Sequence, residues 1–180
     1  GYDPTPAVRK RLHLGNDPHS QWEYWAQQEH PDLQIRNCGV RGERTDEIVQ
    51  RFEECVTGAD GVVIQGGTND LAQGLPVSAV AANLRGMVEA AKEENLDVAL
   101  ADVLPVNPAH PAGDPLIAEL NRRISAIAHS EEVILLPFHQ TLEDRQAPGT
   151  MPSEWTADGL HPSVEGYRRL GELAFEPPGG

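Results

Sequence analysis

The chain has 180 residues and a formal net charge of −14, with 28 acidic residues against 14 Lys and Arg. Nucleic acid and anionic membrane surfaces repel such a chain, so we expect neither as a partner. Hydrophobic residues make up 39% of the sequence, as in ordinary globular proteins. No apolar run approaches the roughly 18 residues that a membrane span requires. The length suits one domain over residues 1–176 with a tail at 177–180, while the compartment and the oligomeric state stay open.

The first half of the chain predicts two helices and two strands. A capping-box spacing at Ser20 opens a helix that runs to Glu29. The run LQIRN (33–37) is predicted as a strand, and a second helix begins at Thr45. The run GVVIQGG (61–67) lacks polar alternation, which is typical of a strand covered on both faces.

The second half continues the alternation. Apolar residues at helical spacing predict helices over 77–92, from Asp114 onward and over 163–175. The runs DVALADVLP (97–105) and VILLPF (133–138) are predicted as strands. This order predicts an α/β fold, a three-layer α/β/α sandwich with a parallel sheet and right-handed crossovers. Ligands of such sheets bind where the loops leave the carboxyl ends of the strands.

The two cysteines, Cys38 and Cys55, match no metal-ligand spacing. We expect them not to form a disulfide. The sequence predicts neither a metal ion nor a cofactor.

The stretch WTADGLHPSVEGY places Asp158 three residues before His161. A carboxylate at this spacing orients an imidazole and stabilises the imidazolium when the ring accepts a proton. One alternative is a metal site, although no further His or carboxylate nearby has ligand spacing. The other is a surface loop that only caps the last helix. The functional interpretation is therefore a general base with its orienting carboxylate.

The stretch GGTND (66–70) directly follows a predicted strand. The side-chain amide of Asn69, held at a strand end, is the kind of group that stabilises an oxyanion. The alternative is an Asx-turn in which Asn69 and Asp70 cap the local backbone.

The stretch NCGVRG (37–42) follows the predicted strand at 33–37. Gly39 has no side chain, so its backbone N–H is accessible to a ligand, and Gly42 permits the turn into the next helix. In isolation the pattern is weak, because Asn-x-Gly is common in turns.

The three motifs fall in a defined order on the predicted loops. In that order they resemble the blocks of the SGNH hydrolase superfamily, also called the GDSL esterases and lipases. The Asn-x-Gly block is Asn37-Cys38-Gly39, the Gly-x-Asn-Asp block is Gly67-Thr68-Asn69-Asp70, and the Asp-x-x-His-Pro block ends at Pro162. The resemblance covers nearly the whole chain.

The resemblance implies a serine ester hydrolase on a flavodoxin-like sheet, with a small-molecule ester as substrate. His161 would be the base and Asp158 its orienter. The backbone N–H of Gly39 and the Nδ2 of Asn69 would be oxyanion donors beside the N–H of the serine.

The family's first block, Gly-Asp-Ser-Leu, does not occur in this sequence. The nearest stretch, Leu14-Gly15-Asn16-Asp17, has Asp where Ser should stand. Other serines are better explained as helix caps, as helix residues or as loop residues without a sharp strand-to-helix turn: Ser20, Ser78, Ser125, Ser153 and Ser163. We predict that the nucleophile and the first strand lie upstream of Gly1. The alternatives for the strand are a separate chain and the stretch RLHL (11–14), which a buried central strand disfavours. In the family's sheet order the first strand lies between 33–37 and the strand at Val62.

The missing block leaves two further hypotheses. The first is a non-catalytic binding module that has lost its serine. The second, a nucleotide-binding protein, is disfavoured because no phosphate-cradling glycine loop follows a strand. His110 and Trp155 are candidates for contacting substrate, and Arg41 and Arg44 for contacting an anionic group, although structural or solvated roles are simpler for all four.

Overall fold

Three of the four predicted strands pair in one parallel sheet. The computed structural model describes residues 17–108 and 114–179. The sheet order is β1 (Gly61–Ile64), β2 (Asp97–Ala101) and β3 (Ile134–Leu136), with both pairs parallel. In the described part of the chain, no helix is long and apolar enough to cross a membrane.

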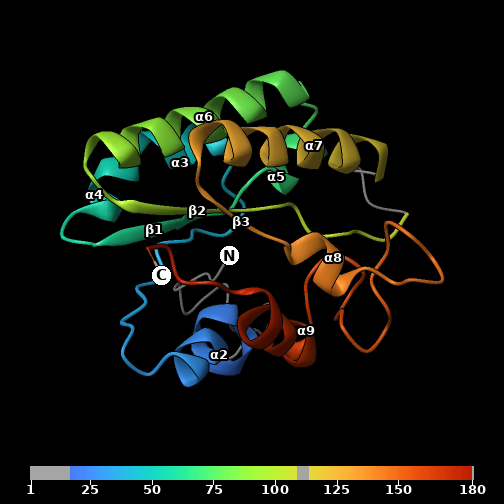
Figure 1. Ribbon diagram of the computed structural model, residues 1–180. Coiled ribbons are helices and arrows are strands. Elements are labelled where there is room, and N and C mark those ends of the chain that lie inside the picture. Colours follow the sequence, from blue (N-terminus) through green and yellow to red (C-terminus); the bar gives the residue numbers. More distant parts are fainter. Residues whose placement is uncertain (1–16, 109–113, 180) are drawn as a thin grey trace.

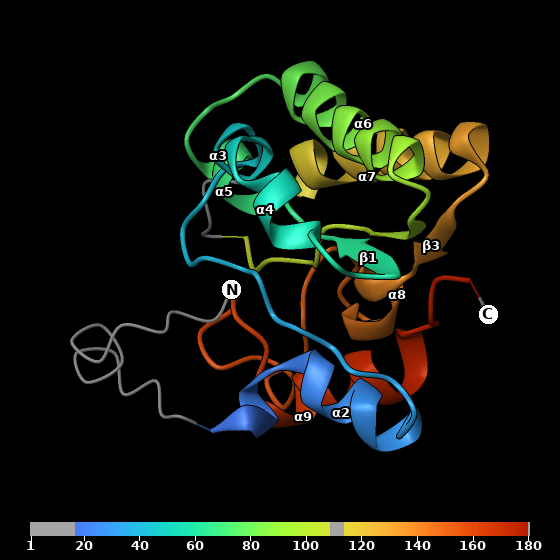
Figure 2. The same ribbon diagram turned by 90° about the vertical axis from the view of Figure 1, so that its left-hand side faces the viewer.

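Helices cover both faces of this sheet, as Figures 1 and 2 show. One face carries α3 (Thr45–Gln50), α4 (Phe52–Val56), α5 (Thr68–Ala72), α6 (Val77–Glu93) and α7 (Asp114–Glu131). The other face carries η1 (Pro18–Ser20), α2 (Trp22–Glu29), α8 (Phe138–Leu142), α9 (Val164–Arg169) and η2 (Leu170–Ala174), which is a π-helical turn. The predicted α/β class with a parallel sheet is confirmed.

Each face of the sheet has its own hydrophobic core. Leu84 and Val88 of α6 and Ile124 of α7 are fully buried in the first core. Trp22 of α2 and Phe138 of α8 meet edge to face in the second core, with ring centroids 5.5 Å apart. The long amphipathic stripes of α6 and α7 therefore pack as their spacing predicts.

The start of α2 differs from the prediction. Ser20 belongs to the preceding 3₁₀ turn η1, and α2 is capped by Gln21 without a side-chain hydrogen bond. The Asp17 carboxylate caps η1 by accepting from the backbone N–H of His19 (3.0 Å). The capping box predicted at Ser20 is wrong because the turn begins two residues earlier than the apolar spacing suggests.

The predicted strand at 33–37 is also wrong. The segment has no ladder partner among the described residues, and its polar groups bind elsewhere. Arg36 donates from Nη2 to the carbonyl oxygens of Cys55 and Thr57, and Asn37 Nδ2 donates to Gln21 Oε1 (2.9 Å). An apolar pattern predicts an extended backbone, but a strand also needs a neighbour within hydrogen-bonding distance, and a cavity separates this segment from β1.

Cys38 and Cys55 form a disulfide, so the expectation that they stay unpaired is wrong. The chain folds back through α3 and α4, and this brings the two Cα atoms to 6.0 Å. That separation lies within the range that a disulfide bridges. Sequence spacing alone does not give it, because it depends on how α4 packs against the segment before α3.

Candidate active site

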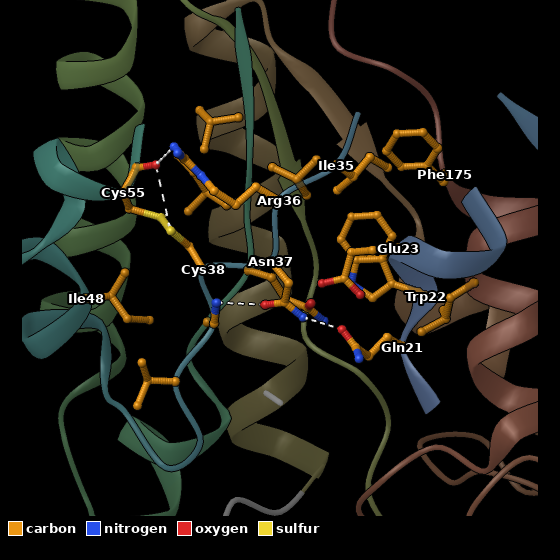
Figure 3. Close-up of a pocket in the computed structure, with 18 of the residues that line it drawn as sticks. Gln21, Trp22, Glu23, Ile35, Arg36, Asn37, Cys38, Ile48, Cys55 and Phe175 are labelled. Atoms are coloured by element: carbon orange, nitrogen blue, oxygen red, sulfur yellow. Dashed lines mark hydrogen bonds between the residues drawn. A yellow bond between two sulfur atoms is a disulfide. The ribbon is translucent and has the colours of Figure 1, made fainter. Parts of the chain in front are cut away.

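A cavity of about 1290 Å³ runs along the outer edge of β1. Residues 32–39 line one side of it and residues 60–65 the other, and Trp22 and Phe175 contribute aromatic walls (Figure 3). At the carboxyl end of β1 its lining includes Gly39, Gly42, Asn69 and His161. The residues selected from three separate motifs therefore share one cavity.

Asp158 and His161 form a hydrogen-bonded pair. The His161 Nδ1 lies 2.8 Å from Asp158 Oδ2, while Asp158 Oδ1 accepts from the backbone N–H groups of His161 (2.8 Å) and Leu160 (3.0 Å). Partial desolvation acts to raise the pKa of the Asp158 carboxyl, but the hydrogen bonds from His161 and Leu160 outweigh it, and the pKa is lowered. The carboxylate stays charged and fixes the ring through Nδ1. The side chains are about half exposed, 53% for Asp158 and 47% for His161.

The loop that carries this pair is held by its own backbone. Thr156 and Pro162 form an antiparallel bridge, and the carbonyl oxygen of His161 accepts from Ala157 N–H (2.9 Å). Gly159 has φ +84°, and a Cβ there would lie 2.8 Å from the Nδ2 of Asn107. Asn107 in turn donates its N–H to the Gly159 carbonyl (2.8 Å). Glycine is thus required at 159, and the segment after β2 fixes the position of the loop.

Asn69 lies in the first turn of α5, directly after β1. The turn requires Gly67, since its φ is +122° and a Cβ would lie 2.7 Å from Leu120 Cδ2. The Asn69 Nδ2 donates to the carbonyl oxygen of Glu43 (2.9 Å), so the amide lies against the loop that follows Gly39. The second hydrogen on Nδ2 remains for another acceptor.

The N–H of Gly39 is already bonded in this structure. It donates to Asn37 Oδ1 at 2.8 Å (Figure 3). For Gly39 to serve as an oxyanion donor, the Asn37 side chain must swing away. The N–H of Gly42, the residue directly before Glu43, makes no hydrogen bond with any residue that the structure describes. Sequence reasoning assigned Gly42 only to the turn, yet it is a second backbone donor at the cavity.

Asp70 joins the Asn69 helix to the start of α3. Its fully buried carboxylate accepts the Thr45 N–H at 3.0 Å on both oxygens, and Asn83 Nδ2 donates to Thr45 Oγ1 (2.9 Å). Burial raises the pKa of Asp70, and the bonds from Thr45 partly offset it. The capping role weighed for Asp70 is therefore real, but it spans two helices rather than a local turn.

No serine hydroxyl within residues 17–108 and 114–179 hydrogen-bonds to the His161 ring. Ser163 donates to the Glu154 carbonyl (2.7 Å) and caps α9 by accepting from Gly166 N–H. Ser20 lines the cavity but belongs to the η1 turn. The nucleophile is thus not identified among the described serines.

The structure separates the residues that the sequence offered for contacting substrate or an anionic group. Trp155 does not line this cavity, and the Arg169 guanidinium stacks on its ring at 3.9 Å from the centroid. Arg44 pairs with Asp46, whereas Arg41 lines the cavity. His110 lies outside the described residues. Over the described ranges, no group of three or more His, Cys, Asp or Glu side chains is placed to hold a metal ion.

The sequence profile of the GDSL-like Lipase/Acylhydrolase family matches residues 1–169. The chain belongs to this family. The resemblance inferred from the three motifs is confirmed, and the protein is a hydrolase of the GDSL type. No curated protein matches the sequence.

Solved structures share the fold. A GDSL-like lipase from Bacteroides thetaiotaomicron is 26% identical, with a TM-score of 0.70 over 92% of this chain and 92% of that chain. A member of the lipolytic G-D-S-L family from Veillonella parvula is 20% identical, with a TM-score of 0.75 over 91% and 90%. The psychrotrophic esterase EstA from Pseudoalteromonas is 19% identical, with a TM-score of 0.68 over 88% and 85%. At the identities of the last two, the likeness concerns the fold alone.

Proposed function

We propose that the protein is a serine-type ester hydrolase that works through an acyl-enzyme. The observation that carries the proposal is the hydrogen bond between His161 Nδ1 and Asp158 Oδ2 (2.8 Å), together with the position of His161, which lines the same cavity as Asn69. The serine oxygen attacks the ester carbonyl carbon while His161 takes its proton, and the alcohol leaves with that proton. Water then attacks the acyl-enzyme by the same route and releases the acid.

The oxyanion is held by the Asn69 amide and by a backbone N–H of the loop at 39–42. Gly39 is our first candidate, on condition that Asn37 releases its N–H, and Gly42 is the second. Loss of one such donor typically lowers turnover by about 100 to 1,000-fold. The serine's own N–H would complete the set.

The serine is proposed to lie on a strand upstream of Gly1 that occupies the cavity beside β1. Within the described part of the chain β1 has one partner, β2, so its other edge presents unpaired N–H and C=O groups. Unsatisfied backbone groups in a core cost about 1–3 kcal/mol each. The half-buried side chains of Ile35, Val62 and Val63 line this cavity and pack against both cores.

These surroundings predict the character of that strand. It would run parallel to β1 and be apolar on both faces, because helices cover it on each side. To follow residues 60–65 it needs about six residues, or roughly 20 Å. Its carboxyl end would then lie beside Asn69 and His161, where a serine has to be.

The test uses the polypeptide with the residues encoded before Gly1. We expect hydrolysis of short-chain p-nitrophenyl esters, and a loss of at least about a thousandfold in kcat in His161→Ala. His129→Ala, an exposed histidine in the last turn of α7, is the matched control and should keep full activity. Full activity in His161→Ala would refute the assignment of the base.

The second candidate function is a non-catalytic binding module. It is favoured by one observation, that no described serine hydroxyl bonds to His161. Intact-mass measurement after treatment with a fluorophosphonate separates the two functions, since only a reactive serine gains the adduct.

A further inference from the structure

The loop from Cys38 to Glu43, which carries both candidate backbone donors, is held at its two ends by one side chain. Arg51 Nη1 donates to the carbonyl oxygen of Cys38 (2.7 Å). Arg51 Nε lies 2.9 Å from both carboxylate oxygens of Glu43, and Nη2 pairs with Glu43 Oε2. The guanidinium thus spans the first and last residues of the loop.

Arg51 reaches the loop because the helix breaks there. Arg51 is both the C-cap of α3 and the N-cap of α4, with φ −118° rather than a helical value. In the predicted helix that begins at Thr45, Ile48 and Val49 share one face with Phe52 and Val56, so the sequence pattern predicts no break at residue 51. The contacts with Cys38 and Glu43 supply a reason for an arginine at the break.

The ion pair is of the kind that fixes geometry. Its side chains are only 26% (Arg51) and 18% (Glu43) exposed, and the pairing is forked rather than through a single bond. Forked arginine–carboxylate pairs are stronger and more directional than point-charge pairs. Removing one partner leaves a largely buried charge, so the contact is not interchangeable with a solvated surface pair.

Glu43 connects this pair to Asn69. Its side chain binds Arg51, while its backbone carbonyl accepts from Asn69 Nδ2 at 2.9 Å. The disulfide from Cys38 to Cys55 of α4 adds a second, covalent attachment at the opposite end of the loop (Figure 3). The backbone donors and the side-chain donor are therefore tied to the same point on the α3–α4 junction.

We infer that Arg51 is a positioning residue that sets the separation between the backbone donors of the 38–43 loop and the Asn69 amide. The inference rests on the proposed function for its catalytic meaning, but its structural content is independent of it. Oxyanion donors act when they lie within about 2.7–3.1 Å of the developing charge. A misplacement of about 1 Å can lower the rate by about 100-fold.

The experiment compares Arg51→Met with Arg51→Lys in the polypeptide that includes the residues encoded before Gly1. Arg51→Met should lower kcat for a p-nitrophenyl ester by about 10 to 100-fold with little change in KM, because the oxyanion forms only after binding. Arg51→Lys should recover part of the loss, since it restores the charge but not the fork.

Arg85→Met is the matched control. It breaks a pair of similar burial with Glu131, between α6 and α7 and away from the cavity, and should leave kcat unchanged. Equal losses of kcat in Arg85→Met and Arg51→Met would overturn the inference, because the effect would then be one of general stability.

Amide hydrogen exchange separates failure of this inference from failure of the proposed function. In Arg51→Met the hydrogen-bonded amides of this loop, Gly39 and Glu43, should exchange at least about tenfold faster than in the wild type, whether or not the wild type hydrolyses esters. If the wild type is inactive but exchange rises, the proposed function fails and the anchoring stands. Unchanged exchange at Gly39 and Glu43 in Arg51→Met would overturn the anchoring itself.

A further variant tests the contribution of the disulfide. Cys55→Ser removes the covalent attachment and leaves Arg51 in place, so exchange of the loop amides should rise less than in Arg51→Met. In the double variant the exchange rate of the loop amides should increase by more than the product of the two single increases. The reason is that in each single variant the remaining attachment still holds the loop. Independent effects that simply multiply would contradict a shared role at this loop.

Discussion

β1 and β2 have similar apolar sequences but different surroundings. β2 lies between two strands, and its residues Val98–Ala101 are buried. Among the residues that the structure describes, β1 pairs on one side only, and three of its four residues are partly exposed. An apolar strand in a parallel sheet is therefore buried by its neighbours, whatever its own composition.

Two carboxylates, Asp102 and Asp158, show a similar contrast. Asp102, which follows β2, is shielded by burial, and this raises its pKa to about 6 despite the N–H bond from His139. Asp158, at the open cavity, is half exposed and has a lowered pKa. Burial on the closed side therefore disfavours a charged carboxylate at Asp102, and the open side keeps the Asp158 carboxylate charged.

The largest effect is expected at the open side. Asp158→Asn should lower kcat for p-nitrophenyl esters by about 10⁴-fold, because an amide cannot stabilise the imidazolium and favours the wrong tautomer. Its effect on the free energy of unfolding should stay within about 1 kcal/mol, because the side chain is half exposed and the Asn Oδ1 can still accept the two backbone N–H bonds. Activity assays and urea unfolding on the same preparation measure both. A large loss of stability with activity intact would contradict the catalytic role assigned to Asp158.

Leu100→Ala and Val62→Ala compare the two strands directly. Leu100 is fully buried in β2, so its truncation should cost about 2–5 kcal/mol. Val62 is half-buried and faces the cavity, and its truncation in the chain from Gly1 to Gly180 should cost about 1 kcal/mol or less. Urea denaturation of both variants is the measurement. Equal losses would show that β1 is as well covered as β2.

A smaller effect is expected in the pH dependence of stability. The pKa of Asp102 rises from 3.8 to about 6 on folding, so between these values the folded protein holds a proton that the unfolded chain has lost. The free energy of unfolding should therefore fall by up to about 3 kcal/mol from pH 4 to pH 7 through this group. Asp102→Asn should lack this decline, because its amide accepts the His139 N–H without titrating.

The measurement is the difference in unfolding free energy between wild type and Asp102→Asn across pH 4 to 7. Carboxyls with lowered pKa, such as Asp158, act in the opposite direction and are common to both proteins. Superimposable curves would contradict the burial of Asp102.

The sequence predicted the parts of the fold that depend on local periodicity. The spacing in α6 and α7 and the unbroken apolar runs of β1–β3 are local properties, and so is the separation of Asp158 from His161. The segment at 33–37 alternates apolar and polar residues, which is also a local strand pattern, but its state depends on a partner that local pattern does not encode. For the same reason the sequence did not reveal the break at Arg51, the disulfide or the bond that engages the Gly39 N–H.

The central claim is that a serine borne on a strand beside β1 reacts at the cavity where His161 and Asn69 meet. The most direct test treats the polypeptide, including the residues encoded before Gly1, with a fluorophosphonate and maps the adduct by peptide mass spectrometry. We predict one adduct, on a serine upstream of Gly1, that forms at least about a hundredfold more slowly in His161→Ala. An adduct on a serine within residues 17–179, or none at all, would contradict the account.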